Sequence, residues 1–196
     1  MTDLRVYPFV RGYAPRHGLF ALWSLMEEDG ATHQVFAVDP PGEGPVDTRG
    51  DLLSFVAYFS AEGENHKAIL VVEDGETGEV VGSVWYDKIQ PQWSAFANIW
   101  MRKKYRGAVA FEAGRKCLAF AFEHYGWRQI WALTHWTHSV RFAKIVGFES
   151  VITLPKFMVA DGHPVDTYML CLSKERFESL ARQSQDDMIV STEPRH

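Results

Sequence analysis

The sequence is poor in cysteine and has no long uninterrupted hydrophobic stretch. Its 196 residues include two cysteines, Cys117 and Cys171, which are too few for a disulfide framework and show no metal-binding spacing. We therefore expect a reducing, cytoplasmic environment and no bound metal. No apolar run follows a basic N-terminal start, and no segment reaches membrane-spanning length. Neither export nor a membrane partner is expected.

The chain also lacks an excess of positive charge. Its 20 Lys and Arg residues against 25 Asp and Glu residues give a net charge of −5. General binding to nucleic acid needs the opposite balance, so no nucleic-acid partner is expected. A hydrophobic content of 46% is enough for one sizeable core. We expect a single domain over residues 1–183, followed by a polar, flexible tail over residues 184–196.

One basic segment stands apart from this acidic background. Four cations, Arg102, Lys103, Lys104 and Arg106, directly precede Gly107. The residues before the segment, 94–101, have the length and aromatic content of a strand, and residues 109–125 have the pattern of a helix. Unpaired N–H groups at a helix start bind phosphate, and a glycine lets backbone approach it closely. The segment therefore predicts a phosphate site, and the alternative is a solvated surface loop.

The hydrophobic patterns on either side of this segment predict further strands and helices. Before it we expect a strand at 4–10, helices at 18–29 and 52–59, and a β-hairpin made of 68–73 and 80–86. Asp47 or Asp51 is the expected cap of the second helix. After it we expect a strand at 128–135, a short helix capped by Thr137, strands at 150–154 and 165–172, and a last helix at 174–183. The first two helices are expected to cover one face of a sheet.

Three segments carry a family resemblance: Tyr105-Arg106-Gly107 with the helix after it, residues 139–148 and residues 161–167. Their order along the chain resembles the GNAT superfamily of acyl-CoA-dependent N-acetyltransferases, and most closely its branch that acetylates ribosomal-protein N-termini. Tyr105-Arg106-Gly107, followed by Glu112-Ala113, is similar to that branch's pyrophosphate loop and the helix after it. Residues 139–148 look like its second cofactor segment, and residues 161–167 resemble the turn into its last strand. The resemblance implies an α+β fold of three layers. Its mixed, largely antiparallel sheet would have about seven strands, splay centrally and carry helices on both faces.

The resemblance also implies acetyl-CoA as co-substrate and an amine-bearing acceptor, either a small molecule or a protein, as partner. A homodimer is one option for its assembly. Pantetheine would pair with backbone at 99–101, and the pyrophosphate would meet the N–H groups of the loop. The residues that the resemblance places against the cofactor are Ile99, Met101, Arg102, Arg106, Gly107, Ala108, Val109, Ala110, Phe111, Trp136 and Phe142.

The sequence departs from the family pattern at several of these places. Val109 and Phe111 occupy positions that the family usually leaves to glycine or alanine, and a β-branched residue resists positive φ and adds bulk. We therefore expect a degenerate pyrophosphate loop. The strand at 94–101 lacks the family's usual carboxylate. Trp136 stands where the family often has Asn, and Ala143 stands where many members have a tyrosine that acts as general acid.

Two histidines and a serine are the catalytic candidates. His135 ends a central strand, and His138 begins the short helix, where the helix dipole favours a neutral imidazole that can act as base. Ser139 matches the branch's serine, which the resemblance implies protonates or positions the leaving thiolate. The alternative is that these side chains only cap, pack or satisfy backbone. Two functions remain open: an active N-acetyltransferase, and a non-catalytic GNAT-fold binding or regulatory protein with weakened or lost CoA binding.

Overall fold

The fold is described here from a computed structural model of the chain. The structure describes residues 3–9, 18–31, 52–60, 66–160 and 163–192, and for residues 184–192 it describes only the backbone. Val10 and the expected helix caps Asp47 and Asp51 lie outside the described residues. Within the described part of the chain, no helix is both long enough and apolar enough to cross a membrane.

A seven-stranded sheet forms the centre of the molecule, in the order β1-β2-β3-β4-β5-β7-β6. Every neighbouring pair is antiparallel except β4 and β5, which run parallel. The strands are β1 (Leu4–Pro8), β2 (Ala68–Asp74), β3 (Val80–Gln90), β4 (Ser94–Met101), β5 (Gln129–Thr134), β6 (Glu149–Ala160) and β7 (His163–Ser173). The expected mixed, largely antiparallel sheet is confirmed.

The two central strands, β4 and β5, separate soon after they begin. Their register covers three pairs, Ser94↔Gln129, Ala95↔Ile130 and Phe96↔Trp131, and then ends. From Ala97 onward, the edge of β4 that faces β5 has no strand partner, although its other edge stays paired with β3. The expected central splay is therefore present.

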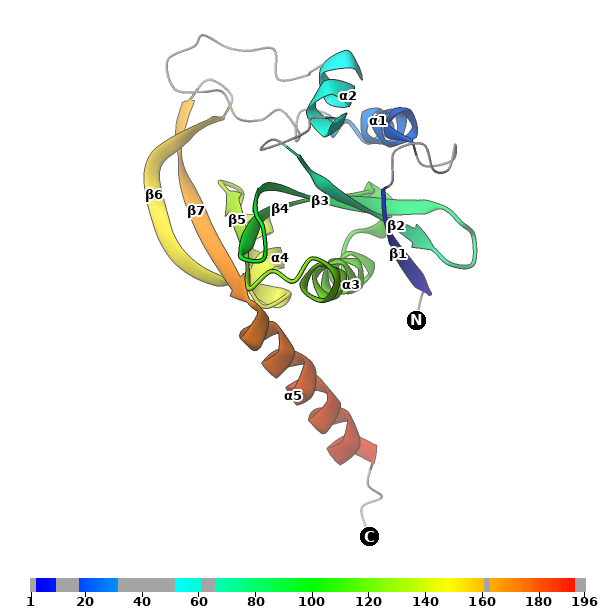
Figure 1. The fold of residues 1–196 in the computed structure, drawn as a ribbon, viewed down its shortest axis with the longest axis vertical. Coiled ribbons are helices and arrows are strands. Elements are labelled where there is room, and N and C mark those ends of the chain that lie inside the picture. Colours follow the sequence, from blue (N-terminus) through cyan, green and yellow to red (C-terminus); the bar gives the residue numbers. More distant parts are fainter. Residues whose placement is uncertain (1–2, 10–17, 32–51, 61–65, 161–162, 193–196) are drawn as a thin grey trace.

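Helices cover both faces of the sheet (Figure 1). On one face lie α1 (Leu19–Glu28) and α2 (Leu52–Ser60), as the sequence predicts. On the other lie α3 (Ala108–His124), which connects β4 to β5, and α4 (Thr137–Ile145). The last helix, α5 (Lys174–Thr192), follows β7 and extends away from the sheet. It continues beyond residue 183, where the expected helix ends.

Two hydrophobic cores, one on each face of the sheet, hold these layers together. Alternation along β3 divides its side chains, since Val84 and Tyr86 pack with the α3 side while Trp85 packs with the α2 side. On the α2 side, Phe59 meets Trp85 edge-on with ring centroids 5.3 Å apart. The apolar stripe of α1, Leu19, Leu22, Trp23 and Met26, is buried in the same core. The sheet therefore separates two chemically distinct sides of the molecule.

Several element boundaries differ from the sequence-based expectation. The α3 helix begins at Ala108 because Gly107 takes the N-cap position with φ +91°, a conformation that favours glycine. Trp136 rather than Thr137 is the N-cap of α4, and no side chain caps it. Strand β6 continues past the predicted end at residue 154 to Ala160, because its backbone pairs with β7 again from Met158 after a register shift. Strand β7 begins at His163 rather than at residue 165.

Candidate active site

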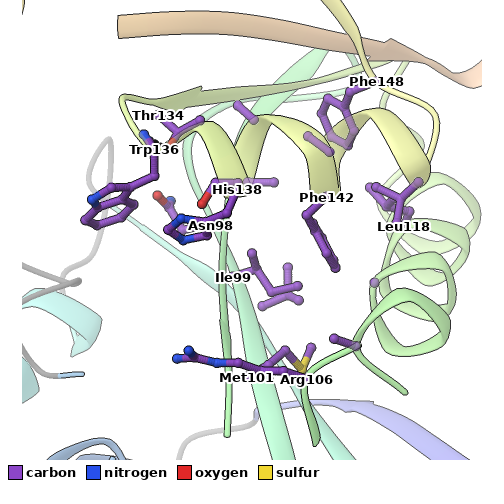
Figure 2. Close-up of a pocket in the computed structure, with 18 of the residues that line it drawn as sticks. Asn98, Ile99, Met101, Arg106, Leu118, Thr134, Trp136, His138, Phe142 and Phe148 are labelled. Carbon is purple, nitrogen blue, oxygen red and sulfur yellow. Dashed lines mark hydrogen bonds between the residues drawn. The ribbon is translucent and has the colours of Figure 1, made fainter. Parts of the chain in front are cut away.

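A cavity of about 570 Å³ lies where β4 and β5 part. Its walls come from β3, β4, β5, α3 and α4 (Figure 2). Trp136 and His138 lie toward one end, and Arg106 and Met101 lie toward the other. The wall between them is mostly apolar and includes Ile99, Leu118 and Phe142. An elongated molecule with a polar end can therefore enter between the two strands.

The first turn of α3 closes the Arg106 end of the cavity. The Phe111 N–H donates to the Gly107 carbonyl (3.2 Å), so the N–H groups that precede it in the turn have no intrahelical acceptor. No side chain caps this helix start, and its first turn contains no acidic residue. A Cβ on Gly107 would meet nothing within 4 Å, so the side of Gly107 where a Cβ would lie is open. This end of the site suits an anion.

The cations of the basic segment divide into two groups. Arg102 donates to Glu79 Oε1 (2.8 Å) and to Glu28 Oε2 (3.2 Å), and its side chain is 14% exposed. Lys104 also pairs with Glu79, and the Tyr105 hydroxyl donates to the second oxygen of the same carboxylate (2.8 Å). Arg106 lines the cavity and has no ion pair with any described residue. It is the cation of the segment that faces a ligand in the cavity, because the Lys103 side chain is exposed and does not line it.

The Glu79 contacts also shift two ionisation equilibria. Hydrogen bonds from Lys104 and Tyr105, followed by the charges of Lys104 and Arg102, lower the pKa of the Glu79 carboxyl. Burial, followed by the bond to Glu79, raises the pKa of Tyr105 to about 12. At neutral pH the carboxylate is therefore ionised and the phenol protonated. These are the states that their hydrogen bond needs.

The start of α4 forms the opposite end of the cavity. Trp136, His138 and Ser139 all line it, and the Trp136 and His138 rings are stacked with centroids 6.0 Å apart. The Trp136 N–H donates to Thr134 Oγ1 (3.2 Å), which holds the turn between β5 and α4. Among the described residues, neither the His138 ring nor the Ser139 hydroxyl has a hydrogen-bond partner. Both groups are available to a ligand.

The structure brings together most, but not all, of the residues predicted for the site. Those that line the cavity are Ile99, Met101, Arg106, Gly107, Ala110, Trp136, His138, Ser139 and Phe142. Those that do not line it are Arg102, Ala108, Val109, Phe111 and His135. His135 instead packs on Trp136, with ring centroids 4.3 Å apart.

The two bulky residues of the loop, Val109 and Phe111, do not line the cavity. Val109 and Phe111 are partly buried and pack against the core on the α3 side of the sheet. The Phe111 ring stacks on Phe142 with centroids 5.2 Å apart. Because residues 109 and 111 have regular helical conformation, neither needs the positive φ that a glycine would supply.

Three polar residues beside the cavity were not recognised in the sequence. Asn98 lines the cavity, and its Nδ2 donates to Asp87 Oδ2 (3.2 Å). The Tyr58 hydroxyl donates to the same oxygen (3.0 Å). Asp87 is the one acidic residue of β3, whereas the family pattern places its carboxylate on the strand before the loop. The sequence feature that could have identified Asp87 is its position in β3, the strand that pairs with β4.

Comparisons with known proteins agree with this geometry. Residues 20–149, more than half of the chain, match the model of a family described as an acetyltransferase (GNAT) domain. No curated protein sequence matches the chain.

Solved structures of spermidine N-acetyltransferase from Vibrio cholerae are similar in fold. The complex with CoA and spermine aligns with a TM-score of 0.65 at 15% identity, over 89% of this chain and 98% of that chain. Mutant forms of the spermidine/spermine N-acetyltransferase from that organism give a TM-score of 0.66 at 15% identity, over 91% and 98%. At this identity the likeness concerns the fold alone. The family match, which covers more than half of the sequence, shows that the chain belongs to the GNAT acetyltransferase domain family.

Proposed function

We propose that the protein is an acetyl-CoA-dependent N-acetyltransferase that moves an acetyl group directly to an amine, with residues 1–183 as its single catalytic domain. The observation that carries the proposal is the parting of β4 and β5 around a cavity that ends at the uncapped start of α3. The family match supports the same activity. When bound, acetyl-CoA would supply the acetyl thioester.

The residues of the site fit this co-substrate. The unpaired edge of β4 offers backbone N–H and C=O groups near Ile99 and Met101, and these need partners that pantetheine amides can provide. The apolar cavity wall suits the pantetheine chain. The N–H groups of Ala108, Val109 and Ala110 would meet the pyrophosphate together with the Arg106 guanidinium. In this proposal Arg102 supports the loop from behind through Glu79.

The loop would therefore work despite its altered sequence. Phosphate binding at a helix start uses backbone donors, and these do not depend on the side chain that each residue carries. Val109 and Phe111 pack on the core and do not line the cavity. The non-catalytic alternative rested on the altered loop, on the missing carboxylate of the strand before it and on the missing tyrosine. The packing of Val109 and Phe111 on the core gives the first of these grounds no support.

Amide formation requires two proton transfers around the reacting atoms. The acceptor ammonium loses one proton, its nitrogen bonds to the thioester carbonyl carbon, and the carbon–sulfur bond breaks. The nitrogen's second proton balances the charge of the departing thiolate. We assign removal of the first proton to His138, with His135 as the second candidate, and protonation or positioning of the thiolate to Ser139. His138 and Ser139 line the same end of the cavity, which supports this assignment.

The acceptor is an amine, and its identity belongs to the proposal. The similar structures are named for action on spermidine and spermine, which supports a small-molecule amine. The Tyr105-Arg106-Gly107 motif supports the branch that acetylates ribosomal-protein N-termini. We also propose a cytoplasmic location, supported by two free cysteines, and a homodimer as one option for its assembly.

Acetyl-CoA binding tests the proposal most directly. A ligand that binds only the native state raises its melting temperature. We expect acetyl-CoA and CoA to raise the melting temperature of the full chain, while adenosine alone, which lacks pyrophosphate and pantetheine, has little effect. Wild-type protein whose melting temperature stays constant up to about 1 mM acetyl-CoA, far above a useful dissociation constant, would contradict the proposal.

A further inference from the structure

Asp87 is the one described carboxylate bonded to a residue that lines the cavity. Both of its hydrogen bonds, from Tyr58 and from Asn98, reach the same oxygen, Oδ2. Among the described residues, no hydrogen bond reaches Oδ1, and no cation lies within ion-pair distance of the carboxylate. Asp87 is half-buried, so one oxygen is fixed by the protein and the other is left for a ligand.

Tyr58 keeps its proton in this arrangement. Burial, followed by the negative charge of Asp87 and the bond to it, raises the pKa of Tyr58 well above its ordinary value. The protonated phenol therefore acts as the hydrogen-bond donor, and the carboxylate acts as the acceptor. Together with Asn98, Tyr58 orients the Asp87 carboxyl group through hydrogen bonds to Oδ2.

Asp87 lies on the face of the sheet opposite α3 and α4. Trp85, two residues earlier in β3, packs with α2, and Tyr58 of α2 reaches Asp87 directly. The proposed pyrophosphate site, at the start of α3, lies on the other face. Asn98, which lines the cavity, bonds to Asp87, so the carboxylate lies next to the cavity on this face. The α1/α2 face is then the side from which an acceptor amine arrives.

The neighbours of Asp87 on this face are aromatic. Phe96 is its register partner in β4, and the Phe96 ring stacks on Trp131 with centroids 6.4 Å apart. Both aromatic residues are only partly buried. They offer an apolar surface directly beside the carboxylate. An amine held at Asp87 would lay its carbon skeleton against these rings.

Two lysines flank the same carboxylate. Lys67 Nζ lies 4.1 Å from the centroid of the Tyr58 ring, and Lys88 Nζ lies 5.2 Å from that of Phe96. Burial lowers the pKa of Lys67, while the charge of Asp87 opposes that shift. One carboxylate and two lysines carry a net charge of +1, so an ammonium is held here only by direct contact with Asp87. A ligand with several positive charges would meet the two lysines.

We infer that Asp87, oriented by Tyr58 and Asn98, is the acceptor-binding residue of this site, and that it selects a primary monoamine whose ammonium is joined to an apolar or aromatic group. This inference rests on the proposed function. Asp87 holds and orients the ammonium, and removal of its proton stays with His138. The aromatic pair Phe96 and Trp131 supplies the preference for an apolar body, and the two lysines disfavour polyamines.

Steady-state transfer assays test this assignment with three probes: 2-phenylethylamine, spermidine and a short peptide with a free N-terminal amine. We expect 2-phenylethylamine to have the highest kcat/KM. Asp87→Asn removes the charge but keeps an oxygen for Tyr58, and we expect it to raise the KM of the amine about tenfold or more. Its kcat should change much less, and its stabilisation by acetyl-CoA should be that of the wild type.

Two further variants separate binding from folding. Exchanging the pair, with Asp87→Asn and Asn98→Asp together, returns one carboxylate to the same place and should recover part of the lost affinity. Tyr58→Phe removes one donor and keeps the charge, so its KM should lie between those of the wild type and Asp87→Asn. An equal loss of affinity in the exchange variant would point to a structural role and overturn the assignment.

The remaining outcomes of the amine assays and of acetyl-CoA stabilisation each overturn a named part of the proposal. Higher kcat/KM for spermidine or for the peptide would overturn the monoamine class, and an unchanged amine KM in Asp87→Asn would overturn the role of Asp87. If acetyl-CoA stabilises the wild type but no probe is acetylated, the acceptor assignment fails while co-substrate binding stands. If acetyl-CoA does not stabilise the wild type, the proposed function itself fails.

Discussion

Gly107 has a backbone conformation that other residues reach only with strain. Its φ of +91° and ψ of −134° place it outside the region that L side chains adopt, although a Cβ there would meet no atom within 4 Å. The requirement for glycine is therefore conformational rather than steric. It orients the first turn of α3 toward the cavity.

We predict that Gly107→Ala lowers stability by about 1–3 kcal/mol and weakens acetyl-CoA binding about fivefold or more, because the N–H groups of the turn would be reoriented. Gly126→Ala is the matched control. Gly126 also has positive φ (+68°) and open space around it, but it follows the other end of α3. Denaturant unfolding and calorimetric titration measure the two effects. Equal acetyl-CoA affinity in the two variants would argue against a phosphate site at Gly107.

Kinetic measurements can isolate the role of His138. Its ring lines the cavity and has no hydrogen-bond partner among the described residues, so the fold does not depend on it. We predict that His138→Ala lowers kcat about 100-fold or more, the usual size of general-base catalysis, and leaves acetyl-CoA affinity nearly unchanged. His163→Ala, at an exposed position that starts β7, is the control. Equal turnover in His138→Ala and wild type would remove this histidine from the mechanism.

At the scale of elements, the β2–β3 hairpin supports the loop that precedes α3. Glu79, at the turn end of the hairpin, binds Arg102, Lys104 and Tyr105, and Arg102 also reaches Glu28 of α1. The Lys103 N–H donates to Asp29 Oδ2 (3.0 Å), next to α1. These contacts therefore hold the loop in position from the side opposite the cavity. Glu79 acts on the phosphate end of the site only through these contacts.

We predict that Glu79→Gln weakens acetyl-CoA binding severalfold while kcat at saturation stays close to that of the wild type. A glutamine cannot accept from three donors with the strength of a carboxylate, so the loop would lose its fixed position. Glu76→Gln, an exposed change in the same hairpin, controls for the loss of one negative charge. Calorimetric titration of the two variants makes the comparison. Identical affinities would show that the loop keeps its position without Glu79.

The same contacts predict a pH dependence. Because the folded state lowers the pKa of Glu79 below its ordinary 4.5, its stabilising contribution is complete above pH 4.5 and is lost as pH falls through the folded pKa. We expect the melting temperature of the wild type to fall more steeply below pH 4.5 than that of Glu79→Gln. Thermal scans across this range would show the curves converging. Parallel curves would assign the acid sensitivity to other carboxylates.

At the scale of the whole molecule, the two faces of the sheet perform different tasks. One core packs α3 and α4 against the sheet and surrounds the proposed co-substrate path. The other packs α1 and α2 and brings Tyr58 to Asp87. Where β4 and β5 part, a cavity is lined by residues from both sides of the sheet, among them Trp85 and Phe142. A direct transfer between two substrates fits such an opening.

Cys117 reports on the integrity of this architecture. It is fully buried in the core between α3 and the sheet, its carbonyl accepts a bond from the Tyr86 hydroxyl (3.1 Å), and burial raises the pKa of its thiol. Cys171 is partly buried. We predict that iodoacetamide modifies Cys171 before Cys117, and that Cys117 reacts only in step with global unfolding. Peptide mass spectrometry along a urea series measures both. Modification of Cys117 in native buffer would contradict this packing.

Much of the fold was predictable because its signals are local. Two apolar runs, 68–73 and 80–86, joined by a turn-rich link predict a hairpin, and helical spacing in 18–29 predicts an amphipathic helix, both of which the structure contains. The splay was predictable only through the family resemblance, since nothing in the composition of β4 or β5 says where their pairing stops. The ends of β6, β7 and α5 were missed because backbone pairing and helix continuation persist through polar positions.

The sequence by itself determined the order of elements, the glycine at the start of α3 and the basic segment before it, because these follow from local sterics, periodicity and charge. Only the tertiary structure decided which charges remain available. It pairs Arg102 with Glu79, leaves Arg106 at the cavity, and brings Tyr58 and Asp87 together across 29 residues of sequence. Such contacts depend on strand register and on where a helix lies over the sheet. Both are set by burial of the two cores as a whole rather than by any short segment.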